Sequence, residues 1–265
     1  MTIKETSGPA HSADLPGRRV SEVVDAKPSL ARSGEFVEVR MWSRGLRITH
    51  WLNLIGIVGL SITGYYIMSP YFTVAPGDAF QAGFRMGWIR FLHFTFAFAW
   101  ISVAILRVYM LFASSKKQGR WKTLWPWWSK DDWKGMWQTL AYYLFLRKEE
   151  PRYLAHNPLQ RVTYSLVYLL CLVELCTGLS LFGLQMGIGN PIWYAISVPA
   201  MLIGVPVVRV IHVVIMYLIW TFVILHVYLV IRDEVISRSG ALSSMIGGTK
   251  YVPADTVIVD ADKLD

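Results

Sequence analysis

Four long apolar stretches constrain this chain more than any other feature. They cover residues 46–68, 88–112, 159–184 and 207–231, and each provides the roughly 20 residues that a helix needs to cross a bilayer. The mean hydropathy is +0.39 and 54% of the residues are hydrophobic, which exceeds the needs of a soluble domain of this size. We therefore predict an all-α integral membrane protein, built as a bundle of four transmembrane helices.

Basic residues predict how this bundle is oriented. The link at residues 114–161 carries ten Lys and Arg residues, whereas the link at 69–90 carries two and the link at 185–209 carries one. Basic links stay on the cytoplasmic side of a membrane. We therefore expect the first of these links and both termini to be cytoplasmic, in a multi-pass protein of the bacterial inner (cytoplasmic) membrane. Because the positive charge lies beside the membrane spans, we expect no nucleic-acid partner.

The segments outside the spans give weaker signals. Residues 1–40 are polar and rich in Ser, Pro and charge, which predicts a disordered cytoplasmic tail, and residues 239–265 are expected to form a cytoplasmic C-terminal tail. The membrane domain between them is expected at residues 41–238. Within the basic link, the aromatic and amphipathic stretch at 131–146 predicts a helix lying on the membrane surface. The apolar stretch at 188–206 is a competing span, but it contains three prolines, so we expect an outer-face cap or partner-docking loop.

Four histidines lie inside the predicted membrane helices: His50, His93, His212 and His226. Ionisable side chains are costly in a membrane and usually mark function. His50 and His226 lie near the cytoplasmic ends of their helices. His93 and His212 each lie about five residues from the outer start of theirs. The four histidines thus form two pairs, each at one depth.

The spacing of the two histidines on the last helix suits two stacked cofactors. His212 and His226 are fourteen residues apart, so both rings share one face, separated by a rise of about 21 Å. Two neutral imidazoles on one iron give a six-coordinate haem suited to electron transfer. We predict two haem b groups, the inner one ligated by His50 and His226 and the outer one by His93 and His212. The alternative is a haem-free transporter or structural membrane protein, because a lone membrane histidine is more often a packed residue.

Two other features allow more than one interpretation. Gly56, Gly59 and Gly64 follow one another along the first helix, where small residues permit either close approach of a flat cofactor or ordinary helix packing. Glu174 lies in the middle of the third helix. A carboxyl group at such a depth either relays protons or bonds to a neighbouring helix.

Several stretches of the chain resemble the b-type cytochrome subunit of membrane-bound nickel–iron hydrogenases. The resemblance spans residues 40 to about 252 and is carried by RITHWLN (47–53), TGYYI (63–67), MGWIRFLHF (86–94), HNPLQR (156–161) and HVYLVIRDEVIS (226–237). The gamma subunit of respiratory formate dehydrogenases is similar in its histidine plan, but MGWIRFLHF and HVYLVIRDE favour the hydrogenase branch. One departure concerns His212, since hydrogenase members often carry further histidines close to that position and only one stands here.

The resemblance implies an electron-transfer role. A periplasmic hydrogenase, with its small and large subunits, would pass electrons through iron–sulfur centres to the outer haem, and the inner haem would reduce a quinone near the cytoplasmic face. The apolar outer loops at 69–87 and 185–206 would contact that partner. The chain has only two cysteines and no nickel site, so we predict no catalytic residue for hydrogen activation. Formate dehydrogenase or another quinone-linked oxidoreductase is the alternative partner.

The similarity to the formate dehydrogenase subunits also implies where a quinone would bind. Polar residues at the inner start of the third helix contact the quinone in those proteins, and the corresponding residues here are Asn157 and Gln160, with His156 adjacent. Asn157 precedes a proline, however, and Asn followed by Pro is also a common way to begin a helix. Both interpretations therefore apply to this segment.

Overall fold

The computed structural model describes residues 17–20, 31–33, 36–71, 84–114, 120–121, 129–149, 151–154, 156–236 and 240–259. These residues fall into two compact units. The first, called the helical unit below, comprises the described parts of residues 43–114 and 169–225. The second, called the terminal unit, comprises the described parts of residues 1–42, 115–168 and 226–265.

Four long helices confirm the predicted spans. They are α2 (Arg44–Met68), α4 (Arg85–Ala113), α7 (Pro158–Met186) and α9 (Val205–Ile236), and each is long and apolar enough to cross a membrane. The helix α2 begins where the Ser43 side chain accepts a hydrogen bond from the backbone N–H of Leu46, as an N-cap residue does.

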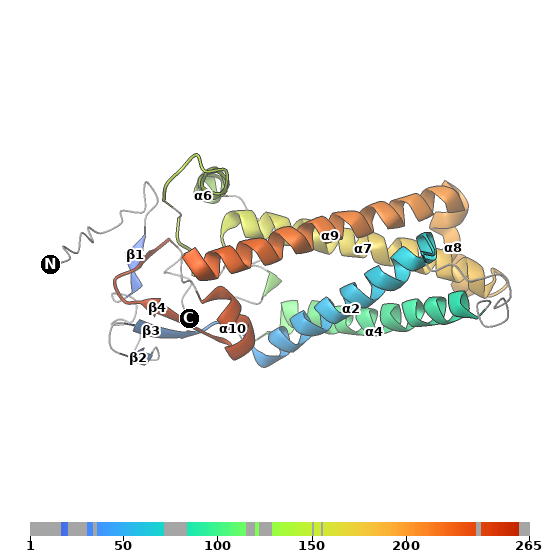
Figure 1. Ribbon diagram of the computed structural model, residues 1–265, viewed down its shortest axis with the longest axis horizontal. Coiled ribbons are helices and arrows are strands. Elements are labelled where there is room, and N and C mark those ends of the chain that lie inside the picture. The colour runs from blue at the N-terminus through green and yellow to red at the C-terminus, as the bar shows by residue number, and fades with distance from the viewer. Residues whose placement is uncertain are drawn as a thin grey trace. The chain divides into compact units, whose positions relative to one another are not determined.

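Glycines on α2 let α4 pack closely against it in the helical unit (Figure 1). A Cβ atom at Gly56 would lie 2.8 Å from Trp100, and one at Gly59 would lie 2.7 Å from Phe96. Since real Cβ atoms do not come so close to other atoms, the two aromatic rings fill the space that side chains at these glycines would occupy. Of the two interpretations given for these glycines, helix packing therefore applies to Gly56 and Gly59.

The apolar stretch at 188–206 contains a helix rather than only a loop. The helix α8 (Pro191–Ile203) has 13 residues, too few to cross a bilayer. Asn190 caps it by accepting a hydrogen bond from the backbone N–H of Ile192, and proline is well tolerated in the first turn. Next to the internal proline, the N–H of Ala200 donates to Oγ of Ser180 on α7 at 2.9 Å. The expectation of a loop is wrong because these hydrogen bonds stabilise a helix that contains prolines.

The stretch predicted as a surface helix forms the helix α6 (Lys130–Tyr143), which ends three residues before the expected position. Its position on the membrane surface stays a prediction. Ser129 and Asp132 form a reciprocal capping box at its start. Asp132 also pairs with the buried Arg161 of α7, with 3.2 Å between Oδ1 and Nη1. This ion pair ties α6 to the first turns of α7 within the terminal unit.

The prediction that residues 1–40 are disordered is wrong for the three described segments, each of which contains a strand. The strands β2 (Ala31–Ser33) and β3 (Phe36–Arg40) form an antiparallel sheet with β4 (Thr249–Pro253) in the order β2-β3-β4 (Figure 1). Two shorter strands, β1 (Arg18–Arg19) and β5 (Val257–Ile258), pair separately. The expected disorder of residues 1–16, 21–30 and 34–35 lies outside the described residues.

A hydrophobic core explains why these terminal segments fold. Val37 and Val39 alternate with more exposed residues along β3 and are buried, as in a strand with one covered face. The C-terminal segment predicted as a tail continues as α10 (Ala241–Gly247) before β4. The core consists of Val20, Val37, Val39, Met41, Leu154, Val252, Ala254 and Ile258.

Candidate functional site

His93 on α4 is held by a threonine of α2. Its Nδ1 lies 2.9 Å from Oγ1 of Thr63, and the Thr63 hydroxyl lies 2.7 Å from the carbonyl oxygen of Gly59. A hydroxyl has one proton, which Thr63 donates to that carbonyl, so its oxygen accepts from the imidazole. Nδ1 of His93 therefore carries the ring proton, and Nε2 keeps the lone pair that binds a metal.

His212 on α9 is held in the same way by a threonine of α7. Its Nδ1 lies 2.9 Å from Oγ1 of Thr177, whose hydroxyl donates to the carbonyl of Val173 at 2.8 Å. By the same argument, Nδ1 of His212 carries the ring proton and Nε2 keeps the lone pair.

A glycine follows each of these threonines and lies against the histidine ring. A Cβ at Gly64 would be 3.1 Å from Cε1 of His93, and a Cβ at Gly178 would be 3.1 Å from Cε1 of His212. Larger residues at these two positions would push the rings away from the helix backbone. Sequence reasoning missed both threonines, although the Thr-Gly dipeptide that recurs in the first and third helices was a signal for them.

The two held rings both lie in the helical unit. Within the described ranges, no three His, Cys, Asp or Glu side chains come together as ligands for a bare metal ion. A porphyrin supplies four of the six ligands to its iron, so two neutral imidazoles with free Nε2 atoms are sufficient. His93 and His212 therefore fit an iron porphyrin.

Glu174 on α7 comes close to this pair. Its Oε2 lies 3.3 Å from Nδ1 of His212, farther than the 2.9 Å to Thr177. Of the two interpretations drawn from the sequence, this distance supports contact with a neighbouring helix.

The other two predicted ligands lie in different units. His50 lies on α2 in the helical unit, where its ring meets that of Trp51 edge to face at 5.3 Å. His226 lies on α9 in the terminal unit, 6.5 Å from the ring of Tyr164. The pairing of His50 with His226 stays a prediction from their depths in the sequence.

The terminal unit brings His226 and the three predicted quinone residues into one neighbourhood. The His156 ring lies between Trp42, at 5.2 Å, and Tyr164, at 5.3 Å. Since Tyr164 also contacts His226, a single tyrosine ring separates His156 from that predicted haem ligand.

Asn157 and Gln160 cap the first turn of α7 reciprocally. Oδ1 of Asn157 accepts from the N–H of Gln160 at 2.8 Å, and Oε1 of Gln160 accepts from the N–H of Asn157 at 3.0 Å. The cap read from the sequence is therefore present. The cap uses the two side-chain oxygens as acceptors and leaves the two side-chain NH₂ groups as donors. A quinone carbonyl binds to such a donor.

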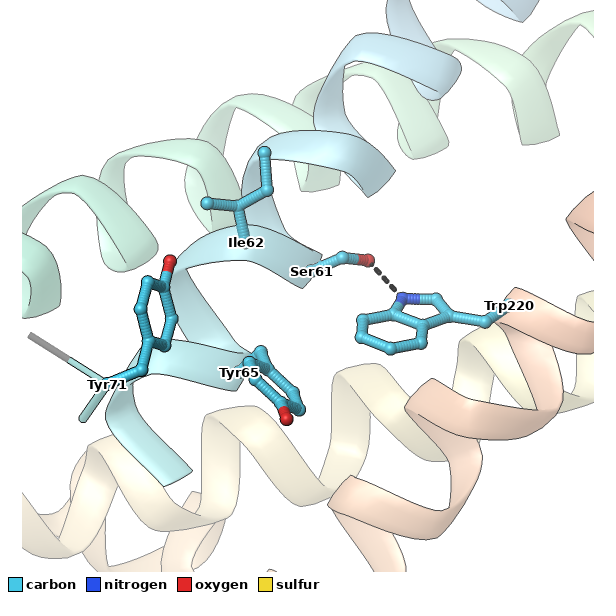
Figure 2. A pocket seen from close by; sticks show the side chains of 5 residues that line it. All are labelled: Ser61, Ile62, Tyr65, Tyr71 and Trp220. Carbon is cyan, nitrogen blue, oxygen red and sulfur yellow. Dashed lines mark hydrogen bonds between the residues drawn. The ribbon is translucent and has the colours of Figure 1, made fainter. Parts of the chain in front are cut away.

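A separate pocket of about 390 Å³ opens on the helical unit between α2 and α9. Its walls are Ser61, Ile62, Tyr65, Tyr71 and Trp220, and the Trp220 indole donates to Oγ of Ser61 at 2.7 Å (Figure 2). No predicted ligand or quinone residue lines it. Tyr65 and Tyr71 lie at the end of α2, where aromatic side chains are typical of a membrane interface, whereas Trp220 lies in the middle of α9.

Known proteins resemble this chain over most of its length. The sequence profile of prokaryotic cytochrome b561 matches residues 41–248. The chain is 33% identical to a probable Ni/Fe-hydrogenase B-type cytochrome subunit of Rhizobium leguminosarum bv. viciae, over 87% of this chain and 96% of that relative. It is 32% identical to the corresponding protein of Azotobacter vinelandii, over 82% and 90%. It is 30% identical to the probable Ni/Fe-hydrogenase 1 B-type cytochrome subunit of Escherichia coli K12, over 82% and 92%.

These matches confirm the family resemblance and the four-span bundle. The sheet strands β3 and β4 lie just outside the matched residues, whereas all four membrane histidines lie within them. The chain therefore belongs to the prokaryotic cytochrome b561 family, as an integral membrane protein of the Ni/Fe-hydrogenase B-type cytochrome subunit kind.

Proposed function

We propose that this chain is a di-haem cytochrome b that carries electrons from a periplasmic Ni/Fe hydrogenase to the quinone pool of the bacterial inner membrane. The observation that carries the proposal is the pair of matched contacts at His93 and His212. In each, a threonine holds Nδ1 and leaves Nε2 available. When bound, two haem b groups supply one-electron transfer between the partner and the quinone.

His93 and His212 serve as ligands of the outer haem. Thr63 and Thr177 fix the two imidazoles in the neutral Nδ1–H tautomer, so neither ring has to lose a proton to bind iron. The glycines beside them allow each ring to lie against its neighbouring helix.

His50 and His226 serve as ligands of the inner haem. The support is the shared face of α9, on which His226 follows His212 by fourteen residues, with a rise of about 21 Å. A second support is the family match, which covers both residues.

The quinone binds at the start of α7. Asn157 and Gln160 each keep an NH₂ group that can donate to a quinone carbonyl while their oxygens form the helix cap. His156 lies beside them and is a suitable proton donor for the reduced product. Tyr164 lies between His156 and His226, so the proposed quinone residues are near the proposed inner ligand.

The partner docks on the outer side. The ten basic residues of the 114–161 link support a cytoplasmic position for that link, which places α8 at the opposite, periplasmic face. Exposed apolar side chains on α8 suit contact with a protein surface; they include Ile192, Tyr194, Leu202 and Ile203. The hydrogenase small subunit, with its large subunit attached, is the proposed occupant.

Co-purification followed by hydrogen-driven reduction tests this function. The chain should purify from membranes together with a hydrogenase small and large subunit. Hydrogen should then reduce both b-type haems, and an added quinone should reoxidise them. Absence of b-type absorption bands from the purified complex would overturn the cytochrome assignment. Haems that formate reduces and hydrogen does not would overturn the hydrogenase assignment.

A further inference from the structure

The residues that hold His93 and His212 in the helical unit, called the two histidine clamps below, follow the same five-residue pattern. On α2 it reads LSITG, from Leu60 to Gly64, and on α7 it reads ELCTG, from Glu174 to Gly178. In both, the fourth residue accepts from Nδ1 of the histidine and the fifth lies against its ring. The two clamps therefore match at their fourth and fifth positions.

Their first positions carry side chains of opposite chemistry. Leu60 offers His93 nothing polar from its side chain, whereas Oε2 of Glu174 lies 3.3 Å from Nδ1 of His212. That oxygen is buried, and it makes no hydrogen bond of good geometry within the described part of the chain. The Nδ1–H of His212 donates to Thr177, and the Glu174 carboxyl lies beside that N–H without a hydrogen bond of good geometry to it.

A carboxyl group at membrane depth is costly unless it has a polar partner. The Glu174 side chain is 22% exposed and the His212 side chain is 24% exposed, so both side chains are largely buried. Each is thus the other's close polar neighbour in addition to Thr177. An oxygen of a carboxyl group accepts a hydrogen bond whether or not the group carries a proton, so the contact does not depend on its charge.

We infer that Glu174 is a positioning residue for the proposed outer haem ligand His212, and that it makes the two axial ligands of this haem unequal. The inference rests on the proposed function. A carboxyl oxygen close to Nδ1–H attracts the ring proton electrostatically and makes Nε2 a stronger donor to a metal. A stronger donor favours the oxidised iron, so Glu174 lowers the midpoint potential of the outer haem. At the equivalent position of the clamp that holds His93 stands Leu60, whose side chain contains no acceptor.

Glu174→Leu tests this inference, because it recreates on α7 the clamp that α2 already has. The purified holo-complex is titrated by spectroelectrochemistry, and the outer haem is identified as the component missing in His93→Ala. In Glu174→Leu the midpoint potential of the outer haem should move to a more positive value while the inner haem stays unchanged. Glu174→Gln, which keeps the size and one acceptor oxygen, should give a smaller shift in the same direction.

The contrary results are distinct. An outer haem that keeps its potential in Glu174→Leu, or two haems that shift equally, would overturn the inference. Loss of the outer haem from the Gln variant would also overturn it, by assigning Glu174 a folding role. If His212→Ala retains both haems, the proposed function itself fails. If His212→Ala loses the outer haem and Glu174→Leu has no effect, only the inference fails.

Discussion

The hydroxyl oxygen of Thr63 lies 2.9 Å from Nδ1 of His93 and accepts a hydrogen bond from its N–H, while the hydroxyl donates a hydrogen bond to the backbone carbonyl one turn earlier on α2. This arrangement places the metal-binding nitrogen of His93 away from α2. It also makes the orientation of an α4 side chain depend on an α2 residue.

Thr63→Val should therefore weaken retention of the outer haem. The variant keeps the shape of the side chain but removes the acceptor, which leaves a buried N–H without that partner at a cost of about 1–3 kcal/mol. Thr63→Ser restores the hydroxyl and should behave like the parent protein. The measurement is haem content per chain after detergent extraction. Equal outer-haem content in the Val and Ser variants would contradict this role.

Asn157→Asp and Gln160→Glu should slow quinone reduction while both haems stay bound and reducible by the partner. Each substitution keeps the oxygen that forms the α7 cap and replaces the NH₂ donor. Asn157→Ala should slow the reaction too, but it also removes a cap residue, at about 1 kcal/mol of stability. The rate of haem reoxidation by a soluble quinone is the measurement. An unchanged rate in the Asp and Glu variants would reject this site.

A photo-cross-linker at Leu202 of α8 should capture the hydrogenase small subunit. Leu202 is 80% exposed on an apolar helix, and the proposed topology places it on the periplasmic side. The same probe at Trp137 of α6, which is also exposed, should not capture that subunit. Capture at Trp137 and not at Leu202 would reverse the proposed orientation. The outer loop at 69–87 was predicted to share this contact, but most of it lies outside the described residues.

Val37→Asp should unfold the terminal sheet. Val37 is fully buried and pairs with Val252, and an unpaired charge at such a position costs several kcal/mol. Phe36→Asp places the same charge on the exposed face of β3 and should be tolerated. Limited proteolysis of the N-terminal segment measures the difference. Equal cleavage of the two variants would contradict the packed sheet.

The sequence predicts the helices well because the signal is local. Apolar length alone places α2, α4, α7 and α9 close to their observed bounds. The depths of His93 and His212 along their helices predict that they pair, and both residues lie in the helical unit. The reciprocal cap of Asn157 and Gln160 is also readable from neighbouring residues.

The features missed from the sequence depend on partners far along the chain. Val37 on β3 pairs with Val252 on β4. Neither segment predicts a strand from its own residues alone. Thr177 becomes meaningful only when α9 places His212 against α7. The α8 helix was missed because its prolines are compatible with a helix only in the presence of contacts such as that from Ser180.

Counting haems in histidine variants tests the central claim most directly. The purified protein should contain two haem b groups per chain by its pyridine haemochrome spectrum, and redox titration should resolve two components. His93→Ala and His212→Ala should each lose the same component, and His50→Ala and His226→Ala should each lose the other. A single haem in the parent protein would contradict the account, as would loss of the same component from His50→Ala and His212→Ala.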